Sequence, residues 1–158
     1  MKTRQHVHEE SFPVTAEELF SALQTPAAIR EWWGAARAIV IPEEGGAWVA
    51  AWGADENSPD YVTAATMKVF DPPRRIVFGD YKYYAKAGVL PFQAEFTTEF
   101  VVEENPNGAT LRVTQDGFPL GSEADEFYIA CEQGWRNTFA GIRRFFENQT
   151  LVKAKLAP

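Results

Sequence analysis

The sequence predicts an α+β fold in which a long C-terminal helix lies across one face of an antiparallel sheet. Several short runs with strand character follow one another between residues 37 and 116, separated by brief turn signals. Two short helical patterns precede these runs, and one long amphipathic pattern follows them. Consecutive strands with short connections favour antiparallel pairing, and an amphipathic helix needs an apolar face to cover.

Length and composition fit one folded domain that spans residues 1–158. A chain of this length buries roughly 68–70% of the surface that its unfolded form exposes. Hydrophobic residues make up 46% of the sequence and aromatic residues 14%, including 5 Trp and 12 Phe. This supply of apolar surface argues against disorder, and the absence of repeats and low-complexity tracts argues against a second domain.

Charge and sorting signals narrow the class of protein. A net charge of −7 repels phosphate backbones, so we expect no nucleic-acid partner. The N-terminus lacks the apolar stretch of a signal peptide, and no apolar run approaches the ~20 residues of a membrane span. The single cysteine, Cys131, excludes an intrachain disulfide and fits a reducing compartment. We therefore expect a cytoplasmic protein without a membrane span.

Two short helices are predicted after a first extended segment. Thr15 is an N-cap candidate, and Glu18 completes the spacing of a capping box. Thr25 is a second N-cap candidate with Pro26 at the first helical position, and Gly34 suits a left-handed C-terminus. The expected elements are an extended segment at 2–12 and helices at 15–23 and 26–33.

The central part of the chain predicts strands with one dry face. Between residues 94 and 103, alternation places Phe96, Thr98 and Phe100 on one face and Glu95 and Glu99 on the other. One face of the sheet is therefore expected to be wet and the other buried. The predicted strands are 37–42, 46–53, 61–70, 75–83, 93–103 and 109–116.

The last helix is predicted to begin at Ser122, which forms a capping-box spacing with Asp125, and to continue to about Asn148. At 1.5 Å per residue it is roughly 40 Å long, enough to cross a sheet. Its apolar face carries two adjoining stripes of residues. These are Phe127, Cys131, Gly134, Thr138, Gly141 and Phe145, and beside them Trp135, Phe139, Ile142 and Phe146.

Two glycines interrupt this helix on its inward face. Gly134 and Gly141 each cost about 1 kcal/mol relative to alanine in a helix interior. They lie seven residues apart and open a groove on one face. Either a strand approaches the helix backbone closely there, or the groove leaves a void that a ligand fills.

Four stretches of the sequence together resemble one protein family. They are FPVTAEELFSALQTPAAIREWWG, VFDPPRRIVF, TLRVTQDGFP and EQGWRNTFAGIRRFFEN, and they span nearly the whole chain. In this order they resemble the homologues of the activator of heat-shock protein 90 ATPase, in the START-like, or SRPBCC, superfamily. The resemblance implies a helix-grip fold, in which a curved seven-stranded antiparallel sheet wraps around the C-terminal helix. It also implies an apolar cavity between sheet and helix.

The resemblance leaves three functions open, because function depends on the site rather than on the fold. Superfamily members include lipid carriers, plant hormone and pollen-allergen binders, polyketide cyclases and aromatases, and the co-chaperone domain itself. Our leading hypothesis is non-catalytic binding of a hydrophobic small molecule, lipid-like or aromatic, without a cofactor. The second is a co-chaperone-like interaction module with a chaperone partner and a role in the stress response. The third is a cyclase-like or hydrolase enzyme.

Aromatic residues supply the candidate ligand contacts. Tyr hydroxyl and Trp NH groups at an apolar cavity can orient a ligand. Cross-strand packing, and core or lid packing of the Trp32–Trp33 pair, explain the same residues. The candidate ligand-pocket residues are Trp32, Trp33, Trp48, Trp52, Tyr61, Tyr81, Tyr83, Phe96, Phe127, Cys131, Gly134, Trp135, Thr138, Gly141 and Ile142.

Two groups of reactive side chains have simpler structural explanations. His6, His8 and Glu10 share one strand face and can bind zinc, but solvent-exposed strand histidines are the simpler interpretation. Cys131 lies on the inner helix face without an identifiable base, which favours core packing over a nucleophile. We therefore expect no metal.

Three carboxylates are considered as acid–base groups for an enzyme. Asp80, Glu95 and Asp116 are conceivable, but alternation puts Glu95 on the wet face, and the two aspartates lie at strand ends that favour solvated turns. No catalytic residue is nominated. The apolar segment 84–92 is either a lid over the cavity or a dimer contact, so a monomer and a homodimer both remain open.

Overall fold

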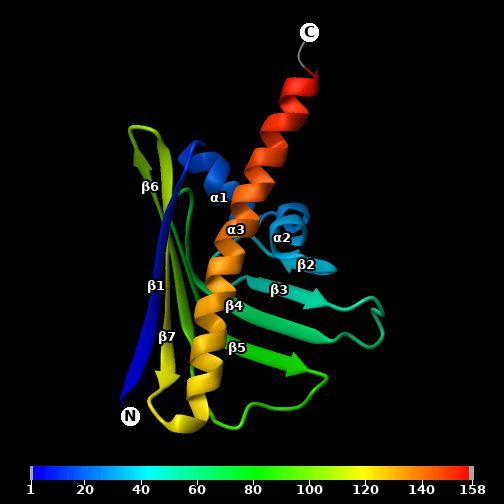
Figure 1. Ribbon diagram of the computed structural model, residues 1–158, viewed down its shortest axis with the longest axis vertical. Helices are drawn as coiled ribbons and strands as arrows, with labels where there is room; N and C mark the ends of the chain where they lie inside the picture. Colours follow the sequence, from blue (N-terminus) through cyan, green and yellow to red (C-terminus); the bar gives the residue numbers. More distant parts are fainter. Residues whose placement is uncertain (1, 157–158) are drawn as a thin grey trace.

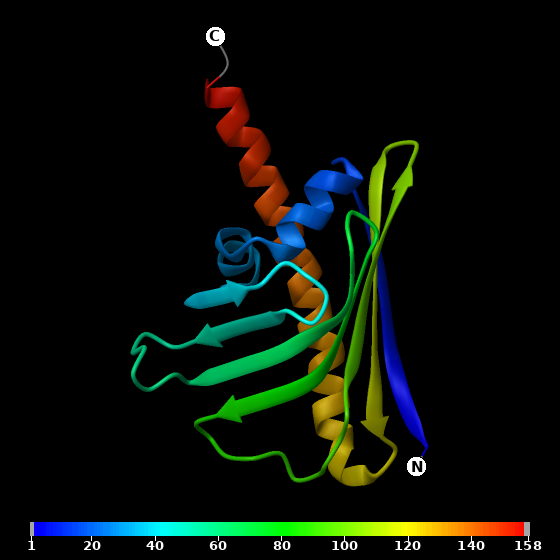
Figure 2. The same cartoon turned by 180° about the vertical axis from the view of Figure 1, so that it is seen from behind.

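A computed structural model, which describes residues 2–156, shows one seven-stranded antiparallel sheet curved around a long C-terminal helix (Figures 1 and 2). The strand order is β1-β7-β6-β5-β4-β3-β2. The predicted α+β helix-grip fold is thus confirmed. The elements are β1 (Thr3–Phe12), α1 (Ala16–Gln24), α2 (Pro26–Trp33), β2 (Arg37–Val40), β3 (Ala47–Trp52), β4 (Tyr61–Asp71), β5 (Arg75–Ala85), β6 (Thr97–Asn105), β7 (Gly108–Pro119), the 3-10 turn η1 (Ser122–Ala124) and α3 (Asp125–Leu156).

The two short helices begin and end largely where their capping residues predict. The Thr15 hydroxyl accepts a hydrogen bond from the Glu18 backbone N–H at 3.0 Å. Gly34 adopts φ 72° and ends α2. The Thr25 side chain does not cap α2, because its hydroxyl donates instead to the Ser21 carbonyl oxygen at 2.7 Å. The start of α2 therefore depends on Pro26.

The predicted dry face of the sheet is confirmed in β6. Thr98, Phe100 and Val102 are buried, whereas Glu103 is exposed. The strand begins four residues later than predicted, at Thr97. The preceding residues run in a loop beside α3, where the Phe96 ring packs 5.6 Å from the Phe127 ring.

The sheet bends at β4 and β5. The β4–β5 register shifts between Ala64 and Thr66 and again between Met67 and Val69. Such irregularities increase the local twist of a sheet. As a result, the outer ends of β3, β4 and β5 turn away from β6 and β7 and face α3 across the concave side (Figure 2).

Helix α3 is longer than predicted. It extends eight residues beyond Asn148, and its last turns project past the sheet (Figure 1). The predicted N-cap at Ser122 makes no capping bond and lies instead in the 3-10 turn η1. Within residues 2–156, no helix combines the length and apolarity that crossing a membrane would require.

The two helical glycines have different surroundings. A Cβ atom added to Gly141 would overlap the carbonyl oxygen of Trp32, so this glycine allows α2 to approach α3 closely. The groove predicted at Gly141 is therefore closed, and the element that closes it is a helix rather than a strand. A Cβ atom added to Gly134 would meet no atom of the described residues within 4 Å, so that part of the groove is open.

The expectation that the histidines of β1 are solvent-exposed is wrong. His6 is buried because β1 lies against the N-terminal half of α3, and its Nε2 donates to the Tyr128 carbonyl oxygen at 2.7 Å. His8 is half-buried beside it. Glu10, on the same strand face, accepts hydrogen bonds from Arg143. Among residues 2–156, no three His, Cys, Asp or Glu side chains are grouped to hold a metal ion.

Candidate functional site

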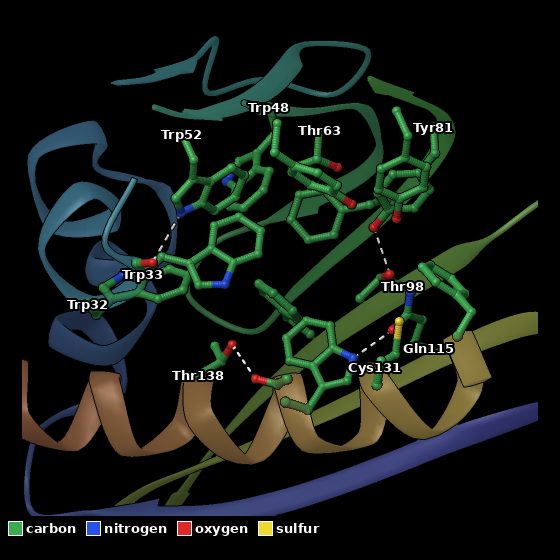
Figure 3. Close-up of a pocket in the computed structure, with 18 residues that line it drawn as sticks. Trp32, Trp33, Trp48, Trp52, Thr63, Tyr81, Thr98, Gln115, Cys131 and Thr138 are labelled. Atoms are coloured by element: carbon green, nitrogen blue, oxygen red, sulfur yellow. Dashed lines mark hydrogen bonds between the residues drawn. The ribbon is translucent and has the colours of Figure 1, made fainter. Parts of the chain in front are cut away.

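A cavity of about 430 Å³ lies between the concave face of the sheet, α2 and the N-terminal half of α3 (Figure 3). Its wall includes all 5 tryptophans of the protein. Among residues 2–156, no Asp, Glu, Lys, Arg or His side chain lines it. The lining residues are Trp32, Trp33, Trp48, Trp52, Tyr61, Thr63, Phe78, Tyr81, Tyr83, Thr98, Phe100, Gln115, Phe127, Ala130, Cys131, Gly134, Trp135 and Thr138.

The alternation of side chains along the strands explains why most of the wall residues face the cavity. Residues two apart on a strand share a face, so Tyr61 with Thr63 and Tyr81 with Tyr83 point to the concave side together. The same period brings Thr98 and Phe100 of β6 into the wall. On α3, spacings of three and four residues direct further lining residues inward from one helix face, and α2 supplies Trp32 and Trp33.

Trp33 is the centre of a tryptophan cluster at one end of the cavity (Figure 3). Its ring centroid lies 4.8 Å from that of Trp52, 5.3 Å from Trp48 and 5.5 Å from Trp32. The Trp32 and Trp48 indole N–H groups donate to carbonyl oxygens near the end of α1, at 2.8 and 3.1 Å. These bonds fix two of the rings, so the cluster is a preformed apolar surface.

Three tyrosines of β4 and β5 form another part of the wall, which begins beside the tryptophan cluster, where the Tyr61 ring lies 5.5 Å from the Trp52 ring. The Tyr81 and Tyr83 rings are nearly parallel with centroids 5.6 Å apart, and Tyr61 lies 6.2 Å from Tyr83. Burial raises the pKa of Tyr61 to about 12 and raises the pKa values of Tyr81 and Tyr83 further above their usual range. All three hydroxyls are therefore neutral at physiological pH and can take part in neutral hydrogen bonds.

Cys131 projects from α3 into the same space. Burial raises the pKa of its thiol to about 12, so the thiolate that would act as a nucleophile is scarce near neutral pH. This favours the structural interpretation of the residue over a catalytic one.

Several polar side chains in the wall make hydrogen bonds within it. The Tyr81 hydroxyl donates to the Thr98 hydroxyl at 2.6 Å, and Thr138 donates to the Gly134 carbonyl oxygen at 2.8 Å. The Trp135 indole N–H donates to the Gln115 amide oxygen at 2.6 Å. The cavity thus combines an apolar aromatic wall with a few oriented polar groups, which is the usual composition of a small-molecule site.

All but three of the sequence-predicted pocket residues line this cavity. The exceptions are Phe96, Gly141 and Ile142: Phe96 packs on Phe118 and Phe127 outside the wall, Gly141 contacts α2, and Ile142 lies in the core. Sequence reasoning missed other members, which are Thr63, Phe78, Thr98, Phe100, Gln115 and Ala130.

Gln115 is the most informative of the missed residues. Alternation along β7 places Leu111 and Val113 on the buried face, and Gln115 occupies the next inward position. A glutamine in the apolar phase of a strand is the signal that could have identified it, because buried amides need partners.

The conceivable acid–base residues lie outside the cavity. Glu95 and Asp116 are exposed and border a separate groove. Asp80 adopts φ 51° and pairs with Lys68. The 84–92 segment passes near the cavity, with Phe92 packed 5.5 Å from Phe127 and Val89 fully exposed. Its roles as a lid or a dimer contact both remain predictions.

The fold and the cavity together define a helix-grip protein of the START-like class. The family described as Activator of Hsp90 ATPase homolog 1-like protein matches residues 13–147. The chain therefore belongs to this family. No curated protein matches it.

Solved structures agree on the architecture. A protein from Mesorhizobium loti is 19% identical with a TM-score of 0.74, and the match covers 92% of this chain and 98% of that one. An uncharacterized protein from Rhizobium leguminosarum is 20% identical with a TM-score of 0.73, covering 93% and 96%. A protein of unknown function from Staphylococcus aureus is 10% identical with a TM-score of 0.74, covering 95% and 97%. At these identities the likeness shows the fold alone.

Proposed function

We propose that this protein binds an uncharged hydrophobic small molecule, aromatic or lipid-like, in the cavity between the sheet and α3. The observation that carries the proposal is a cavity of about 430 Å³ walled by all 5 tryptophans, with no charged side chain of the described residues in its lining. A volume of roughly 300–1,000 Å³ is typical of small-molecule sites. Burial of apolar surface, at about 25 cal/mol per Å², supplies the driving force.

The chemistry of the wall supports binding rather than acid–base catalysis. The ionisable groups in the lining are three tyrosines and Cys131, whose pKa values are raised by burial. A general acid or base works best with a pKa near the working pH. The carboxylates considered for an enzyme lie elsewhere, so the cyclase-like or hydrolase alternative has no acid–base pair in this cavity.

The natural ligand can be identified by native mass spectrometry of protein gently purified from its host, followed by denaturing extraction. We expect a stoichiometric apolar adduct. Location is tested with N-phenylnaphthylamine, an uncharged aromatic probe whose fluorescence rises in apolar sites. Gly134→Leu should weaken its binding at least about tenfold, because a side chain at this position enters open space beside Ala130 and Cys131.

Gly134→Ala is the matched control, since its methyl group meets nothing within 4 Å and should leave probe binding nearly unchanged. Equal probe affinity in a well-folded Gly134→Leu protein would show that the probe binds elsewhere. Absence of both an adduct and probe binding would contradict the proposed function.

Family membership favours a second candidate, a co-chaperone-like interaction with heat-shock protein 90. Its test is the ATPase rate of the purified chaperone with and without this protein. Stimulation that persists in Gly134→Leu would support an interaction surface independent of the cavity. An unchanged rate would count against this candidate and leave the small-molecule proposal standing.

A further inference from the structure

A row of polar groups crosses the largely aromatic cavity wall from β5 to α3. The Tyr81 hydroxyl donates to Thr98, and the Trp135 indole donates to Gln115 (Figure 3). Thr98 and Gln115 are direct cross-strand partners in the β6–β7 register. Their Cβ atoms are therefore about 5 Å apart on the same face of the sheet. Four side chains from four different elements thus meet in one place.

The Gln115 amide is held in a single orientation by its partner. An indole N–H can only donate, so the atom that it meets must be the amide oxygen of Gln115. The Nε2 amide nitrogen must then point elsewhere. Gln115 is only 5% exposed, yet Nε2 has no hydrogen-bond partner among residues 2–156 and is not one of the fully enclosed unpartnered atoms. It therefore opens onto cavity space.

The Thr98 hydroxyl adds a second donor beside this amide. Its oxygen already accepts the proton of Tyr81, so its own proton is free to be donated. Thr98 is 2% exposed, and within residues 2–156 no protein group accepts from it. A buried donor without an acceptor is unfavourable, and an acceptor on a bound molecule would relieve the cost.

Resting on the proposed function, we propose that Gln115 and Thr98 form a carbonyl-binding subsite that selects uncharged ring compounds carrying a carbonyl oxygen. A carbonyl oxygen accepts two hydrogen bonds and brings no donor that would need a partner of its own. The rings of Phe100 and Trp135 stand edge to face, 6.1 Å apart, beside this row and offer apolar surface to the body of the ring compound. A carboxylate would lack a cation to balance its charge.

The test compares tetralone with tetralin, two bicyclic compounds that differ by one carbonyl oxygen. Isothermal titration calorimetry gives the ratio of their dissociation constants for the natural protein, Gln115→Met and Thr98→Val. We expect each substitution to reduce the relative preference for tetralone about fivefold to tenfold, as loss of one neutral hydrogen bond predicts, with little change for tetralin. In the natural protein, tetralone but not tetralin should shift the NMR signals of the Gln115 side-chain amide.

Thr114→Val is the matched control, because Thr114 directly precedes Gln115 on β7, faces the opposite side of the sheet and is not part of the cavity lining. This variant should keep the ratio of the tetralone and tetralin dissociation constants that the natural protein shows. Thr98→Val preserves side-chain shape and covers the case in which Gln115→Met, which leaves Trp135 unpaired, fails to fold. If tetralin binds but the ratio is the same in all variants, the subsite is overturned while the proposed function stands. If neither compound binds, the subsite and the proposed function both fail for ring compounds.

Discussion

At the scale of single residues, Gly134 and Gly141 show how one residue type meets two needs on the same helix face. Gly141 lets the backbone of α2 come within contact of α3, and Gly134 leaves open space at the cavity. Neither role follows from helix propensity, which disfavours both positions equally. The difference depends on which neighbour lies opposite.

This difference predicts stability changes of opposite sign for two alanine substitutions. Gly134→Ala should raise the free energy of unfolding by about 0.5–1 kcal/mol, because alanine is the better helix former and its methyl group meets nothing. Gly141→Ala should lower it by more than about 1 kcal/mol, because the methyl group overlaps the Trp32 carbonyl oxygen and forces α2 away. Urea unfolding measures both values. Equal stabilisation by the two substitutions would contradict the close α2–α3 contact.

At the scale of elements, β1 packs against the N-terminal half of α3, the helix that supplies part of the cavity wall. The His6 ring stacks on Tyr128 with centroids 3.9 Å apart, and the Arg4 guanidinium lies 4.2 Å from the centre of the same ring. His8 completes this strand face, with Nε2 buried and without a hydrogen-bond partner among the described residues. The strand thus presses a partly aromatic, partly titratable surface onto the helix.

This contact should weaken on acidification. Burial, and then the neighbouring His6, hold the pKa of His8 below its usual 6.5, with Arg136 acting in the same direction and Glu132 opposing. The folded state thus binds fewer protons than the unfolded state. The contribution of neutral His8 to stability is complete above pH 6.5 and is lost as the pH falls through the lower folded-state pKa of this residue. Urea unfolding between pH 8 and 5 should show this loss.

Two variants test whether His8 causes the loss of stability on acidification. His8→Gln should flatten the dependence of unfolding free energy on pH. Val7→Gln, a substitution at the exposed neighbouring position, should retain it. The Glu132 carboxyl, whose pKa is lowered mainly by its hydrogen bond from Arg136, titrates below 4.5 and so lies outside the measured interval. An unchanged slope in His8→Gln would show that other groups control the acid response.

At the scale of the whole molecule, the protein combines a net charge of −7 with a cavity that, in the part of the chain the structure describes, is lined by no charged side chain. An anionic ligand would meet the repulsion of the whole chain and would lose its hydration without gaining a counter-charge. Size and apolarity alone would not discriminate between a fatty alcohol and the corresponding fatty acid. If the proposed function holds, the charge distribution should discriminate between them.

We therefore expect decanol to raise the midpoint of thermal unfolding at pH 7, in proportion to its binding, while decanoate at the same concentration leaves it nearly unchanged. Differential scanning fluorimetry or circular dichroism can follow the transition. At a pH low enough to protonate decanoate, the two should become similar. Equal stabilisation by both at pH 7 would show that a cation reaches the bound ligand and would contradict the uncharged cavity.

Local signals in the sequence predicted most of the elements, because caps, turns and alternation are decided by neighbouring residues. Thr15 with Glu18, Gly34 at the end of α2, and the alternation in β6 all agree with the structure. Boundaries that depend on distant contacts were missed. β6 begins later than predicted because Phe96 packs on α3. The Thr25 hydroxyl bonds to the preceding helix instead of capping α2.

By itself the sequence determined the fold class, the family resemblance and most aromatic residues of the cavity wall, because periodicity fixes which side chains share a face. The tertiary structure alone decided which of those faces meet. It placed Gly141 against a helix and Gly134 beside open space, buried His6 under α3, and brought Gln115 opposite Trp135. These pairings join residues from different elements, and their geometry depends on how the sheet curves around α3 rather than on any local pattern.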